Sequence, residues 1–122
     1  MTMPKRGEIY WLDFSPATGA EMREPHPALV IQNDVGNQAS ALTIVAAITS
    51  NLRVARLPVG ILVEPGESGL PKPSAVHLGH IYSVDQTRLR QRAGQLGAAT
   101  MRKVDRAIAI SLGLLPFVLP EE

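Results

Sequence analysis

The amino-acid sequence predicts a small, mainly β (α+β) domain in which an antiparallel barrel or curled sheet is followed by one helix. Short apolar runs rich in Val, Ile and Leu alternate with turn-forming stretches, and the 122 residues include 10 Gly and 10 Pro. A helical repeat of apolar residues appears near the end of the chain. The length predicts a single domain over residues 1–122, with no room for a second core.

The first half of the chain contains three predicted strands. Residues 7–14 form a short apolar run, and the charges, prolines and glycine of residues 15–27 are typical of a long exposed loop. Residues 28–32 predict a second strand, which ends in the turn-forming residues 33–37. Residues 42–49 are almost continuously apolar, which predicts a strand buried on both faces.

The second half continues with a fourth strand at residues 57–63, where Pro58 favours an edge position or a strand start. Residues 64–73 are rich in Gly and Pro and predict a loop. Further short strands are predicted at residues 75–78, 81–84 and 92–96.

Residues 100–112 are the predicted helix. Apolar side chains recur there at helical spacing, at Met101, Val104, Ile108 and Leu112. Thr100 is placed to cap its start, and Gly113 lies where a left-handed residue ends a helix. The proline-broken apolar residues 114–120 predict a tail that lies against this subunit or a partner.

Composition narrows the function classes. Hydrophobic residues make up 45% of the chain, enough for a core without a metal, and the absence of cysteine excludes disulfides and fits a reducing compartment. No apolar segment follows the N-terminal residues, so we expect no secretory signal, and no stretch is long enough to span a bilayer. A net charge of +1 neither favours nor excludes RNA as a ligand.

Several blocks follow one another along nearly the whole chain. Residues 5–16 read KRGEIYWLDFSP and residues 26–37 read HPALVIQNDVGN. Further blocks are residues 19–21, 44–50, 69–76, 84–89 and 104–114. In this order they resemble the MazF/PemK/Kid toxins of type II toxin–antitoxin systems.

The resemblance implies an SH3-like antiparallel β-barrel of the CcdB/PemK type with a C-terminal helix, assembled as a homodimer. It implies a cytoplasmic toxin that uses neither metal nor cofactor and has no membrane partner. Such a toxin cleaves single-stranded RNA at a short sequence through attack by the 2′-hydroxyl, which inhibits translation and growth. It further implies a MazE-like antitoxin whose acidic tail occupies the RNA groove and whose complex binds DNA.

The chain departs from the family where the chemistry is expected. The family usually has Arg-Pro at the position of His26-Pro27, and many members have Gln and Arg where this chain has His80 and Tyr82. Kid-like members place an acid–base Arg and Asp at positions that match His77 and Gly79. Both usual arginines are therefore replaced.

All three histidines of the chain fall on or beside these positions, which suggests a retuned active site. An imidazole exchanges protons near neutral pH, whereas arginine mainly stabilises charge. We expect His26 to contact the scissile phosphate or act as general acid, and Thr49 to donate its hydroxyl to a phosphate oxygen. Either His77 or His80 supplies the base or second acid. The two point to opposite faces of a regular strand, and His80, beside Gly79, is preferred.

RNA contacts are expected from Glu21, Asn33, Ser50, Tyr82 and Arg88. Tyr82 can stack on a base, whereas Trp11 is interpreted as core or dimer packing. Arg88, Arg90 and Arg92 alternate, and can either follow a phosphate backbone or form a charged edge that prevents sheet association.

Plainer interpretations stay open for each residue. His26 can be a solvated turn residue, His77 a hydrogen-bonded strand residue, and Thr49 an ordinary strand-end threonine. Three histidines can also bind zinc, although no supporting ligand spacing is present. At the level of function, the alternatives to an endoribonuclease are a catalytically weakened protein that binds RNA, antitoxin or operator, and a gyrase poison of the CcdB kind.

Overall fold

The protein is described by a computed structural model over residues 3–13 and 25–116. Its elements, in chain order, are β1 (Glu8–Leu12), β2 (His26–Val30), α1 (Asp34–Ala39), β3 (Leu42–Thr49), the 3₁₀ helix η1 (Leu52–Arg56), β4 (Gly60–Val63), α2 (Pro65–Ser68), β5 (Ser74–Asp85), the 3₁₀ helix η2 (Gln86–Arg88), β6 (Leu89–Gln95) and α3 (Ala98–Ser111). The mainly β class with a C-terminal helix is confirmed.

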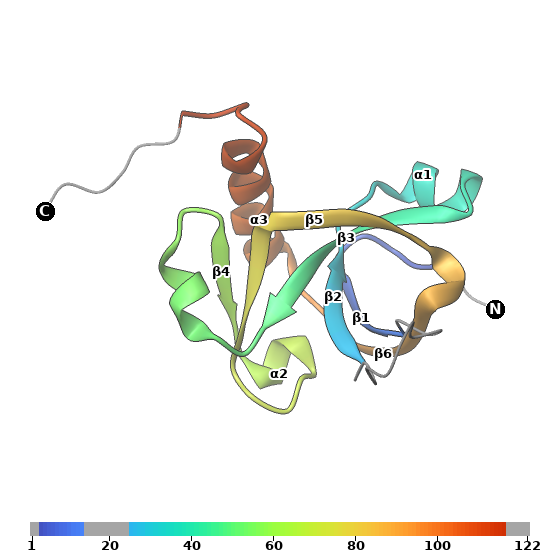
Figure 1. Ribbon diagram of the computed structural model, residues 1–122, viewed down its shortest axis with the longest axis horizontal. Helices are drawn as coiled ribbons and strands as arrows, with labels where there is room; N and C mark the ends of the chain where they lie inside the picture. The colour runs from blue at the N-terminus through green and yellow to red at the C-terminus, as the bar shows by residue number, and fades with distance from the viewer. Residues whose placement is uncertain (1–2, 14–24, 117–122) are drawn as a thin grey trace, which may run out of the picture.

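The strands form one antiparallel sheet in the order β4-β5-β3-β2-β1-β6. Figure 1 shows β5 and β3 running the length of the molecule, with the sheet curling round through β2, β1 and β6 at one end and α3 packed at the other. Among the described residues no ladder joins β4 to β6, so the sheet curls without closing into a barrel.

Each face of the curled sheet buries its own apolar cluster. The larger cluster lies under α3, where Val104 and Ala107 are buried against side chains such as Leu29, Ala46 and Leu78. The smaller cluster contains Leu12, Ala28, Val30 and Val45. The alternation along β3 supplies both clusters, which confirms that this central strand is buried on both faces.

Several boundaries differ from the sequence-based prediction. The predicted strands at 75–78 and 81–84 are one strand, β5, interrupted by a bulge. Residues expected as a turn form α1, because the Asn33 side chain caps its first turn by accepting from the Gly36 amide at 2.7 Å. Four residues of the predicted loop 64–73 form α2, and β6 starts at Leu89 instead of residue 92.

Helix α3 begins at Ala98, so the predicted cap at Thr100 is wrong. The N-cap residue is Gly97, which has no side chain to accept a hydrogen bond. Glu67 of α2 supplies the missing acceptor: its carboxylate accepts from the Gly97 amide at 2.8 Å and from the Thr100 hydroxyl at 3.1 Å. The predicted left-handed residue after the helix is confirmed, because Gly113 has φ +80°.

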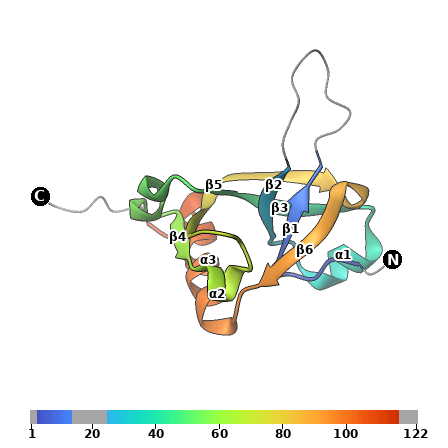
Figure 2. The same cartoon turned by 90° about the horizontal axis from the view of Figure 1, so that it is seen from below.

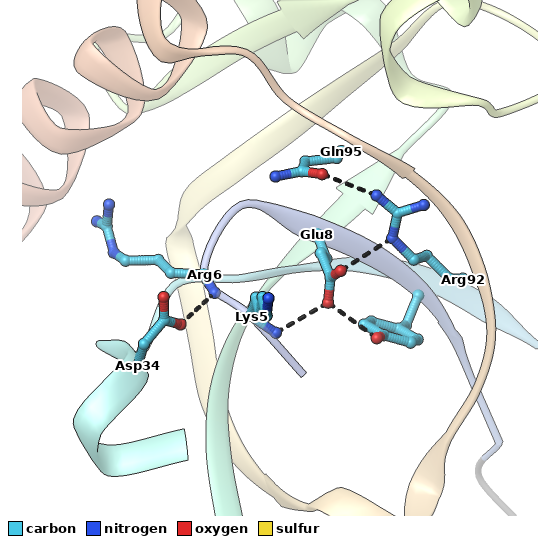
Figure 3. Close-up of polar contacts among 7 residues, drawn as sticks. Lys5, Arg6, Glu8, Asp34, Arg92 and Gln95 are labelled. Carbon is cyan, nitrogen blue, oxygen red and sulfur yellow. Dashed lines mark hydrogen bonds and ion pairs between the residues drawn. The ribbon is translucent and has the colours of Figure 1, made fainter. Parts of the chain in front are cut away.

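A carboxylate at the centre of a hydrogen-bond network joins β1 to β6 (Figure 3). Glu8 accepts from the backbone amide of Lys5 at 2.8 Å, from the Tyr10 hydroxyl at 2.9 Å and from the Arg92 guanidinium at 3.0 Å. Arg92 also donates to the Gln95 side chain at 2.8 Å. Burial, aided by the hydrogen bond to Glu8, raises the pKa of Tyr10 to about 12. The network fixes the edge strand β6 onto β1.

The described residues contain no helix that is long and apolar enough to cross a membrane.

Candidate active site

Two adjoining hollows open beside the start of β2 and the end of β3, and together they form what we call the histidine hollow. Their volumes are about 350 and about 490 Å³. Both are lined by His26 and Pro27 of β2, Ala47 and Ile48 of β3, and His80 of β5. The larger one is also lined by Trp11, Thr49 and Ser50, and by Leu70, Pro71 and Lys72 of the segment before β5 together with Ser74, the first residue of β5.

His26 and Thr49 meet here because of the pairing of their strands. The last pair of the ladder between β2 and β3 is Ala28 with Ala47; His26 and Thr49 each lie two residues beyond it, and both line the larger hollow. His26 is the first residue of β2 and not, as expected, part of the preceding loop. The sheet thereby brings together two residues that are far apart in the sequence.

The Thr49 hydroxyl has a defined orientation. Its oxygen accepts a hydrogen bond from the Asn51 amide at 3.1 Å, in the turn that follows β3. A hydroxyl that accepts through its oxygen keeps its own hydrogen for a second partner. Thr49 can therefore donate to an anion bound in the histidine hollow.

A bulge in β5 determines which histidine reaches the hollow. Ala46 pairs with Ile81, but the next residue of β3, Ala47, pairs with His77, so residues 78–80 are additional on β5. His80 lies at the end of this bulge and lines both hollows. In a regular strand the side chains of residues 77 and 80 would point to opposite faces. The bulge allows the two imidazole rings to approach one another, and their centroids are 6.3 Å apart.

His77 stabilises the bulge instead of lining the hollow. Its Nδ1 accepts a hydrogen bond from the Gly79 amide at 3.0 Å. A Cβ atom at Gly79 would lie 2.8 Å from the His77 ring, so the close approach needs glycine. His77 therefore supports the backbone segment that carries His80.

Tyr82 lies beside His80 on the same strand, with ring centroids 5.5 Å apart and the rings tilted by 46°. It lines the smaller hollow and is half-buried, and burial raises the pKa of its hydroxyl. The half-exposed ring is suited to stack on a base.

The lining of the histidine hollow favours a negatively charged ligand. No Asp or Glu is among the described residues that line it, whereas two histidines and Lys72 are. Sequence reasoning missed Lys72. The sequence feature that could have indicated it is a single cationic residue between Pro71 and Pro73, within the block 69–76 that resembles the family.

Three predicted RNA contacts lie elsewhere or cannot be placed. Asn33 caps α1 and does not line the hollow. Arg88 lies in η2, where its guanidinium donates to the Asp13 carbonyl at 3.4 Å. Glu21 lies outside the described residues.

The alternating arginines line an exposed edge. Arg90 and Arg92 lie on the edge strand β6. Arg90 forms an ion pair with Asp13 at 2.8 Å, and Arg92 forms one with Glu8 at 3.0 Å. This arrangement favours the interpretation of a charged edge over a phosphate track.

In residues 3–13 and 25–116 no group of three or more His, Cys, Asp or Glu side chains is arranged so that it could hold a metal ion.

Residues 5–112 match the family described as PemK-like, MazF-like toxins of type II toxin–antitoxin systems. The chain is 41% identical over 113 residues to endoribonuclease EndoA of Bacillus subtilis, which covers 93% of this chain and 97% of EndoA. It is 39% identical over 112 residues to endoribonuclease MazF of Staphylococcus saprophyticus, covering 92% of this chain and 93% of that protein.

Solved structures share the fold. A mycobacterial endoribonuclease in complex with its cognate antitoxin superposes with a TM-score of 0.76 at 25% identity, over 92% of this chain and 97% of that one. A MazE–MazF complex from Deinococcus radiodurans gives a TM-score of 0.78 at 24% identity, over 94% of this chain and 100% of that chain.

Proposed function

This chain belongs to the PemK-like, MazF-like family of type II toxin–antitoxin toxins, and from that premise we propose that it is an endoribonuclease that cleaves single-stranded RNA at a short sequence. The observation that carries the proposal is the convergence of His26, Thr49 and His80 on one hollow that no described carboxylate lines. These side chains offer two proton-transfer groups and a hydroxyl donor around a space that favours an anion.

The proposed reaction needs no water and no metal in its cleavage step. His80 takes the proton of the 2′-hydroxyl, and the 2′-oxygen forms a bond to phosphorus while the bond from phosphorus to the 5′-oxygen breaks. His26 gives its proton to the leaving 5′-oxygen. Thr49 donates a hydrogen bond to a non-bridging oxygen. The products are a 2′,3′-cyclic phosphate and a 5′-hydroxyl; His80 ends with the proton of the 2′-hydroxyl, and His26 ends neutral because its proton is on the 5′-oxygen.

Cleavage of cellular mRNA by such a site in the cytoplasm would inhibit translation and growth. Base specificity is proposed to come from two further residues of the lining. The aromatic ring of Tyr82 lines the smaller hollow, and Ser50 lines the larger one.

The proposed inhibitor is a MazE-like antitoxin with an acidic segment. Carboxylates would fill the histidine hollow by pairing with the same cationic and hydroxyl groups that hold the RNA phosphate. The solved mycobacterial endoribonuclease of the same fold is itself bound to its cognate antitoxin.

A homodimer is proposed from the apolar surface at the β4 end of the molecule. Within the described part of the chain β4 pairs only with β5, and Leu62 on this edge strand is 48% exposed. Leu57, which precedes this strand, and Leu112 and Leu114, which follow α3, are also exposed. Helix α3 lies at the β4 end of the molecule (Figures 1 and 2). Exposed leucines gathered at one end of a small protein favour burial against a second copy.

The experiment that tests the proposed activity incubates the purified protein with a long single-stranded RNA in the presence of EDTA. We expect cuts at one recurring short motif, with 5′-hydroxyl ends. His26→Ala should slow cleavage by at least about a hundredfold without changing the folded protein's circular dichroism spectrum. An inactive wild type that still binds the RNA would favour the second candidate, a binding protein, which the replacement of both family arginines makes reasonable.

A further inference from the structure

The proposed reaction increases the negative charge on the phosphate, and the histidine hollow must stabilise that charge. A phosphodiester carries one negative charge, and the pentavalent transition state carries nearly two. His26 and His80 exchange protons during the reaction, so their charges are not constant. Thr49 and Ser50 are neutral donors. The site therefore requires a group whose positive charge is permanent.

Lys72 is the one Lys or Arg side chain among the described residues that line the histidine hollow. An ammonium group stays positive well above neutral pH. The arginines of β6 are engaged with Asp13 and Glu8 on the charged edge and do not line the hollow.

The backbone that carries Lys72 is held on both sides. Before it, Leu70 is buried at 3% exposure, and its amide donates to the Ser68 hydroxyl at 3.1 Å. After it, the Ser74 hydroxyl donates to the Lys72 carbonyl at 3.0 Å. The neighbouring Pro71 and Pro73 restrict the backbone further.

The preceding helix α2 is itself fixed to the rest of the protein. Gly69 has φ +76°, and a Cβ atom there would lie 1.8 Å from the Ala93 carbonyl oxygen of β6, so the backbones are in close contact. Glu67 joins α2 to the start of α3 through its two hydrogen bonds. The segment thus presents Lys72 to the hollow from a preorganised support.

We propose that Lys72 is a further catalytic residue, whose ammonium group contacts a non-bridging oxygen of the scissile phosphate and stabilises the transition state. It supplies the fixed positive charge that His26 cannot supply. Lys72 transfers no proton, so the bonds made and broken are those of the proposed cleavage. The inference rests on the proposed function.

The test uses a short RNA that spans a cleavage site mapped first with the wild-type protein. Lys72→Met should lower kcat about 10- to 100-fold and change KM by less than about threefold, because the additional charge appears in the transition state. Lys72→Arg should retain cleavage within about fivefold of wild type, since the charge is kept.

Lys103→Met is the matched control. It removes the same charge from an exposed position on α3 that does not line the hollow, and should leave kcat unchanged. Three results would overturn the role of Lys72. They are a loss of kcat in Lys103→Met equal to that in Lys72→Met, an unchanged kcat in Lys72→Met, and a change in the KM of Lys72→Met alone. Failure of the wild type to cut any RNA would instead overturn the proposed function, which keeps the two outcomes distinct.

Discussion

The Nδ1 atom of His77 accepts a hydrogen bond from the backbone amide of Gly79 at 3.0 Å, and this contact stabilises the bulge that delivers His80 to the histidine hollow. Acceptance through Nδ1 leaves Nε2 as the protonated nitrogen of the neutral ring. The contact distinguishes the two histidines, because His77 supports the backbone of the bulge whereas His80 lines the histidine hollow.

His77→Ala should therefore reduce RNA cleavage by roughly ten- to a hundredfold, because a small misplacement of His80 is costly. His77→Asn should retain most activity, since its side-chain oxygen can accept from the Gly79 amide. The pH profile of kcat/KM in His77→Asn should match that of the wild type. A profile that loses one limb in this variant would mean that His77 itself transfers a proton.

Thr49→Val removes the hydroxyl and nearly preserves the volume of the side chain. The variant should lower kcat on the order of a hundredfold, as expected for the loss of one donor to a developing oxyanion. Thr49→Ser keeps the hydroxyl and should stay within about tenfold of wild type. Single-turnover cleavage of a mapped RNA measures both, and equal rates for Val and Ser would remove Thr49 from the mechanism.

Glu67→Ala removes the carboxylate that caps α3 in place of a side chain at Gly97. We expect the free energy of unfolding to fall by about 1 kcal/mol in urea denaturation, the usual cost of losing a helix cap. Glu64→Ala serves as the control. Glu64 is the N-cap residue of the short α2, but its side chain makes no capping hydrogen bond there, so the variant removes a carboxylate without removing a cap. Equal losses in the two variants would argue against the capping role.

Acid should destabilise the protein partly through Asp34. Its carboxylate accepts from the Arg6 amide at 2.7 Å, and this bond, with smaller contributions from Asn37 and nearby cations, lowers the pKa of Asp34 below 3.8. A lowered folded-state pKa stabilises the fold above the unfolded pKa, and this stability is lost as the pH falls through the folded value.

Unfolding in urea at a series of pH values between about 5 and about 2 measures this contribution. Asp34→Asn should show a shallower loss of stability with falling pH than the wild type. The pKa of Asp85 is also lowered, by hydrogen bonds from Thr87, so the double variant with Asp85→Asn should be shallower still. An unchanged slope in both variants would assign acid unfolding to other groups.

Leu62→Lys should weaken the proposed homodimer, because it sets a charge on the exposed edge strand β4. Val35→Lys is the matched control: Val35 is 76% exposed on α1, at the opposite end of the molecule in Figure 1. Sedimentation equilibrium should report a lower association constant for Leu62→Lys alone. A wild type that is monomeric at micromolar concentration would contradict the dimer.

The sequence by itself determined the fold class, the central buried strand and the region of the C-terminal helix, since these follow from local apolar periodicity. Through a family resemblance it also proposed His26, Thr49 and His80 as candidate site residues. It could not show that β5 is continuous through Gly79, because a bulge depends on what the neighbouring strands pair with. It missed α1 and α2, which are too short to show a helical period.

Tertiary structure alone decided which of the candidates meet. The pairing of β2 with β3 brings His26 and Thr49 to one hollow, the bulge brings His80 there and not His77, and the anchoring of α2 brings in Lys72. Each of these placements depends on contacts between residues far apart in the chain. The propensities that predict single elements carry no information on such contacts, which the packing of the whole sheet fixes at once.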